Sequence, residues 1–115
     1  MALLQFDTTL SSAGDALIAL SGELDLSGAP ALDQEIEQLA ARPEIRRVVV
    51  DLRRLDFLDS SGLRSVALAD RRLSGSGRSL VLVRGNESVQ RVFEITRMVE
   101  RLTFVDRPEL NGSAG

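Results

Sequence analysis

Two adjacent serines, Ser60 and Ser61, lie where a buried strand should pass into a helix. The apolar run before them ends in Asp51, and the segment Asp59-Ser60-Ser61-Gly62 has the residue types of a helix start. A helix N-terminus tolerates a phosphate on serine because its backbone N–H groups are unpaired and its dipole end is positive. Phosphoserine carries about −1.5 to −2 charges at neutral pH, which a docked partner would meet directly. The pattern therefore predicts a phosphorylation-controlled binding site.

The same segment is also consistent with an ordinary helix start, because Ser and Asp are both preferred N-caps. A cap uses only one hydroxyl group. The second serine then has no structural role, which favours the phosphorylation hypothesis.

Three carboxylates in this region, Asp51, Asp56 and Asp59, raise the alternative of a magnesium site or an acid–base enzyme. We interpret Asp51 as a structural residue at the strand end and Asp56 as a loop acid, since magnesium sites usually draw acids from several loops. A receiver-type phosphoacceptor aspartate is disfavoured because that pattern needs a lysine, and the chain has none. Asp25 follows an earlier strand, and two readings of it stay open: a turn acid, or a group at the same sheet edge as Ser61.

Composition excludes several classes of function. The 115-residue chain has no Cys and no His, which removes disulfides, the common zinc sites and the usual nucleophile–base pairs. A net charge of −3 and only four aromatic residues, all Phe, argue against nucleic-acid binding. No apolar run is long enough to span a membrane, and no secretory signal is recognisable, so we expect a cytoplasmic protein.

Hydrophobic periodicity predicts strands at residues 3–9, 16–21, 47–52, 80–83 and 103–105. It predicts helices from Pro30 to about residue 41, from Ser60 or Ser61 to Gly75, and from Asn86 onward. The inward stripe of the third helix is expected to be Val92, Ile95, Val99 and Leu102, with Val89 and Phe93 alongside. This order predicts a single α/β domain: a mixed sheet of four to five strands with about three to four helices packed on it.

Several segments together resemble the STAS domain family, and within it the bacterial anti-anti-sigma factors, also called anti-sigma factor antagonists. The residues that carry the resemblance are Gly22-Glu23-Leu24-Asp25, Val48 to Leu52, Phe57-Leu58-Asp59-Ser60-Ser61-Gly62-Leu63, and Val89 to Thr96. It implies a STAS domain over residues 1–109. The small and polar residues that follow predict a flexible tail at 110–115.

The resemblance implies that Ser61 is the phosphoacceptor and that the chain itself needs no cofactor or metal. Because the common catalytic residue types are missing, we also expect that the chain is not an enzyme. The implied partner-binding residues are Asp25, Asp59, Ser60, Ser61, Gly62, Leu63 and Arg64. The implied partners are an anti-sigma factor that is also a serine kinase, bound by the unphosphorylated form, and a serine phosphatase that reverses the modification. Whether Ser60 can replace Ser61 stays open.

An alternative within the same fold is a scaffold subunit of a transporter, lipid-trafficking or stress-sensing complex, without a phosphate switch. One departure from the family pattern concerns the last helix, where Arg97-Met98 stands in place of the frequent Gly-Leu. A glycine there would supply a left-handed helix end, so its absence predicts a helix that continues toward Arg101.

Overall fold

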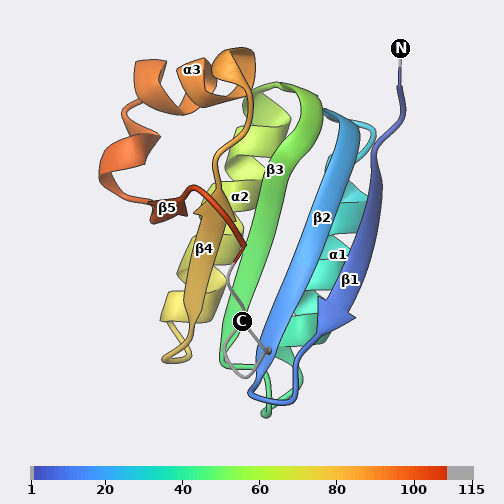
Figure 1. Ribbon diagram of the computed structural model, residues 1–115, viewed down its shortest axis with the longest axis vertical. Coiled ribbons are helices and arrows are strands. Elements are labelled where there is room, and N and C mark those ends of the chain that lie inside the picture. Colours follow the sequence, from blue (N-terminus) through green and yellow to red (C-terminus); the bar gives the residue numbers. More distant parts are fainter. Residues whose placement is uncertain (1, 109–115) are drawn as a thin grey trace.

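One five-stranded sheet organises the chain, with its strands in the order β1-β2-β3-β4-β5 (Figure 1). The computed structural model describes residues 2–108, so the predicted tail at 110–115 lies outside the described residues. The strands are β1 (Gln5–Leu10), β2 (Asp15–Leu24), β3 (Arg47–Leu58), β4 (Ser79–Val83) and β5 (Phe104–Val105). Strand β1 pairs antiparallel with β2, and every other neighbouring pair is parallel. The predicted mixed α/β sheet is confirmed.

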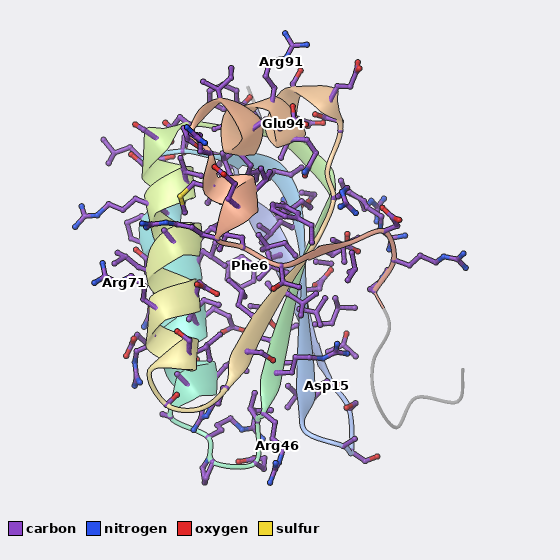
Figure 2. All side chains as sticks on the ribbon, turned by 90° about the vertical axis from the view of Figure 1, so that its left-hand side faces the viewer. Phe6, Asp15, Arg46, Arg71, Arg91 and Glu94 are labelled. Carbon is purple, nitrogen blue, oxygen red and sulfur yellow. The ribbon has the colours of Figure 1, made fainter. Side chains whose placement is uncertain are left out.

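Three α-helices connect the strands: α1 (Ala29–Ala40), α2 (Ser60–Ser74) and α3 (Glu87–Ile95). Helices α1 and α2 cover one face of the sheet, and α3 lies at the end where β4 points (Figure 1). Figure 2 shows this layering from the side, with the opposite face free of helices within residues 2–108. The main core fills the space under α1 and α2, and a smaller cluster of Val49, Val81 and Val83 lies on the opposite face. In the described part of the chain, no helix has the length and apolar character that a membrane crossing requires.

Strand β3 is twice as long as the sequence pattern predicts, and it runs to Leu58 rather than to Leu52. Its pairing with β2 shifts register twice, between Ala19 and Ser21 and between Gly22 and Glu23. Each irregularity adds one residue to β3, so Leu52, Leu55 and Leu58 all reach the core at a spacing of three. The prediction that Asp51 ends the strand and that Asp56 lies in a loop is therefore wrong.

The last helix ends at Ile95, so the predicted continuation toward Arg101 is wrong. Arg97 itself adopts the left-handed conformation, with φ of 63°, and a short 3₁₀ turn at Met98–Glu100 follows. The predicted inward stripe is also wrong in part, because Ile95 is 73 % exposed and Val99 is 38 % exposed. Val89 and Phe93 carry the helix packing instead, and both are fully buried.

Glycine at position 97 is expected to stabilise the protein, because a left-handed backbone costs a non-glycine residue about 1–2 kcal/mol. Arg97→Gly should raise the free energy of unfolding by about 0.5–1 kcal/mol after the entropy cost of glycine is subtracted. Urea denaturation measures the change. The matched control is Arg101→Gly, where φ is −106° and glycine should lower stability. If the Arg97→Gly protein were less stable than wild type, the left-handed backbone at this position would not be strained.

Candidate functional site

The carboxyl ends of β2 and β3 form one edge of the sheet, and the predicted site lies along this edge. Leu24 and Leu58, the last residues of these strands, are direct register partners. The backbone N–H of Asp59 donates to the carbonyl of Leu24 at 3.2 Å, which joins the start of α2 to the end of β2. Asp25 and Ser61 therefore emerge at the same edge, as one of the two readings of Asp25 predicts.

The carboxylate of Asp59, and not a serine hydroxyl, caps helix α2. Its Oδ1 accepts from the N–H of Ser61 at 2.9 Å and from the N–H of Gly62 at 3.1 Å. Ser60 is the first helical residue. Within residues 2–108, no protein group is hydrogen-bonded to the hydroxyl of Ser60 or Ser61. Because Asp59 is the cap, helix capping explains neither of the two serines.

Ser61 lies in a groove between α1 and α2. This α1–α2 groove encloses about 260 Å³ and is lined by Leu26, Ala29, Pro30, Asp33, Ser61, Arg64, Ser65 and Leu68. It continues between the helices into a second hollow, because Asp33, Ser65 and Leu68 line both. Two of its apolar side chains are strongly exposed, Leu26 at 75 % and Leu68 at 43 %. The groove thus places a modifiable hydroxyl beside apolar surface that is open to a partner.

The other predicted site residues take different positions around Ser61. Ser60 and Arg64 are exposed, and Asp59 is half-buried at the cap. Gly62 is buried against β2, and Leu63 is half-buried against the main core. Gly62 and Leu63 therefore position the start of α2, while Ser60, Ser61 and Arg64 present side chains to solvent.

Asp25 also acts as a turn acid. The two interpretations of this residue therefore both hold: it lies at the same edge as Ser61, and its carboxylate accepts hydrogen bonds in the turn. Its Oδ1 accepts from the Ser27 hydroxyl at 2.8 Å and from the N–H groups of Ser27 and Gly28, each at 3.1 Å. The bond from the Ser27 hydroxyl, followed by the one from the Gly28 N–H, holds the pKa of Asp25 below its usual value. A fixed negative charge therefore lies in the loop before α1.

The acids weighed as a metal or acid–base site do not converge. In register with β2, Asp51 pairs with Ala19 and Leu58 pairs with Leu24. Asp51 is therefore roughly 17 Å from the residue before Asp59, at about 3.3 Å per residue over that stretch of β2. Burial is the largest single influence and would raise the pKa of Asp51, but the side-chain and backbone hydrogen bonds from Arg53, together with the positive charges of Arg53 and Arg54, outweigh it and lower that pKa. Among residues 2–108, no three acidic, His or Cys side chains are arranged to hold a metal ion. The magnesium alternative thus has no assembled site in the described residues.

The sequence prediction missed the apolar members of the groove, Leu26 and Leu68, and the acid Asp33. Leu68 lies on helix α2 between inward positions, and Leu26 follows Asp25 in a loop, so neither has a periodic signal that marks it as exposed. Their proximity to Ser61 depends on how α1 packs against α2, which local patterning does not specify.

Comparison with known proteins shows which family the chain is similar to. A family model described as "Mlab, STAS domain" matches residues 8–105. BtrV of Bordetella bronchiseptica, assigned as an anti-sigma factor antagonist, is 38 % identical over 83 residues, which covers 72 % of this chain and 71 % of BtrV.

Solved structures agree with the fold. The crystal structure of an anti-sigma factor antagonist from Mycobacterium paratuberculosis superposes with a TM-score of 0.79 at 26 % identity, covering 94 % of this chain and 88 % of that one. The phosphorylated form of the Bacillus cell-fate determinant SpoIIAA superposes with a TM-score of 0.71 at 21 % identity, covering 88 % of this chain and 91 % of that one. The SpoIIAA comparison concerns the fold alone.

Proposed function

This chain belongs to the STAS domain family, with anti-sigma factor antagonists among its relatives, and from that premise we propose that it is a phosphoserine-switched binding module. In the unphosphorylated state it binds an anti-sigma factor that is also a serine kinase, which releases a sigma factor. Phosphorylation of Ser61 ends the complex, and a serine phosphatase restores it. The chain itself catalyses nothing, needs no cofactor and acts in the cytoplasm.

One observation carries the proposal: Ser61 lines the α1–α2 groove while the carboxylate of Asp59 caps the helix. A kinase therefore finds an acceptor whose modification leaves the cap in place. In the transfer, the Ser61 Oγ forms a bond to the γ-phosphorus of ATP, the bond to the leaving ADP breaks, and the serine proton passes to a base on the kinase.

Charge explains why the phosphate would end binding. The unphosphorylated groove offers apolar contacts from Leu26 and Leu68, so a partner that fits it excludes water near Ser61. A phosphate at Ser61 would add about −1.5 to −2 charges where Asp33 and Asp59 already contribute negative charge. Like charges enclosed at an interface cost several kcal/mol, and each 1.4 kcal/mol is a tenfold loss of affinity.

A pull-down from the native cell, made before and after phosphatase treatment, tests the proposed function. We expect the tagged chain to capture an anti-sigma factor with an ATPase domain, in larger amount after treatment. Intact-mass analysis of the starting material should show a single phosphate on part of the population. Equal capture with no phosphate in any growth condition would instead support a non-switching scaffold subunit and overturn the proposal.

A further inference from the structure

Arg64 is a cation with no ion-pair partner in the α1–α2 groove. It follows Ser61 by three residues in α2, is exposed, and lines the same groove as Ser61. The salt bridges found within residues 2–108 do not include it. In the adjoining hollow, by contrast, Arg72 is paired with Glu37 at 3.0 Å.

The spacing of Ser61 and Arg64 suits an ion pair within one helix. Residues three apart have Cβ atoms about 5–6 Å from each other, which the long arginine side chain can span to reach a phosphate oxygen. Guanidinium and phosphate form paired, charge-assisted hydrogen bonds. The other charged residue that lines the groove is Asp33, and the carboxylate of Asp59 caps the helix beside Ser61. Both of these carboxylates repel a phosphate.

We propose that Arg64 is the internal counter-charge of the phosphate on Ser61, an inference that rests on the proposed function because it takes Ser61 as the acceptor. The ion pair holds the phosphate along α2 and turns the guanidinium away from a partner. Phosphorylation thus removes an attractive group from the groove in addition to placing negative charge there. The unphosphorylated protein keeps Arg64 available for a carboxylate of the partner.

The test measures the second pKa of the phosphate by ³¹P NMR titration, with phosphoserine incorporated at position 61 during translation so that no kinase is needed. That pKa is about 6 for an unperturbed phosphoserine. We expect it to be about half a pH unit lower in the otherwise wild-type protein than in Arg64→Gln, and we expect Arg64→Lys to restore most of the difference. The difference should shrink at high salt, because screening weakens exposed ion pairs.

Arg71→Gln is the matched control, because Arg71 is exposed on the same helix and lies on its outer side, away from the sheet (Figure 2). This control should leave the phosphate pKa unchanged. Equal pKa values in the wild-type and Arg64→Gln proteins would overturn the ion pair and leave the proposed switch untouched. A phosphorylated protein that binds the anti-sigma factor as tightly as the unmodified one would overturn the switch and leave the pKa difference standing.

Discussion

Alanine at position 61 should abolish phosphate incorporation by a cognate kinase. The expectation follows from the groove, where Ser61 is a half-buried lining residue and its hydroxyl has no capping role. The measurement is intact-mass analysis after incubation with the kinase and ATP. Wild type should gain one phosphoryl group, and Ser61→Ala should gain none.

Ser60→Ala is the control for this result, since Ser60 is adjacent, exposed and equally free of a capping role. It should still accept one phosphoryl group. Full modification of Ser61→Ala, or loss of modification in Ser60→Ala with Ser61 intact, would show that the acceptor is assigned to the wrong serine. Ser61→Ala should also retain partner binding, because a methyl group adds no charge to the groove.

Alanine at position 62 should destabilise the whole protein, although alanine normally favours a helix over glycine by about 1 kcal/mol. A Cβ on Gly62 would lie 2.6 Å from the carbonyl oxygen of Leu24 and 2.7 Å from its Cγ. The same carbonyl accepts the hydrogen bond from Asp59, so the start of α2 cannot move away without losing that contact. We expect Gly62→Ala to lose about 1–3 kcal/mol in the free energy of unfolding, measured by urea denaturation.

Gly75→Ala provides the comparison for this prediction. Gly75 also has right-handed helical φ and ψ, but it is exposed at the end of α2, and its nearest contact to a new Cβ is 3.1 Å. Its stability should change by less than that of Gly62→Ala. A Gly62→Ala protein as stable as wild type would mean that α2 and β2 are less closely packed than the structure indicates.

The order of strands and helices could be predicted from the sequence because most elements have a simple period and clear ends. The three valines at 48–50 mark a strand covered on both faces, and Val49 indeed packs on the face opposite to Val48 and Val50. The capping role of Asn86 was also predictable, and its Oδ1 accepts from the N–H of Val89 at 2.9 Å.

Two features of the fold could not be read from periodicity. The second half of β3 has core residues at every third position, which matches no regular strand. The two bulges in its pairing with β2 each take up one extra residue, so these side chains still point to the same face of the sheet. At Arg97, the chain adopts the left-handed conformation with a residue that disfavours it, between Phe93 and Leu102, which are both buried. Local preference does not predict this helix end.

The candidate site divides in the same way. Asp59, Ser60 and Ser61 form a contiguous motif whose place at a strand–helix junction follows from local sequence. The groove around Ser61 combines the loop after β2, helix α1 and helix α2, so Leu26 and Asp33 join it only through the fold. Local sequence thus marks the proposed acceptor, and tertiary structure supplies the surface that a partner would contact.

The most direct test of the account is the affinity of the anti-sigma factor for two forms of the chain, measured by isothermal titration calorimetry at one ionic strength. The forms differ only in a phosphate on Ser61. We predict that the phosphorylated form binds at least about 100-fold more weakly, equivalent to about 2.7 kcal/mol, while its circular dichroism spectrum is unchanged. Equal dissociation constants for the two forms would contradict the account.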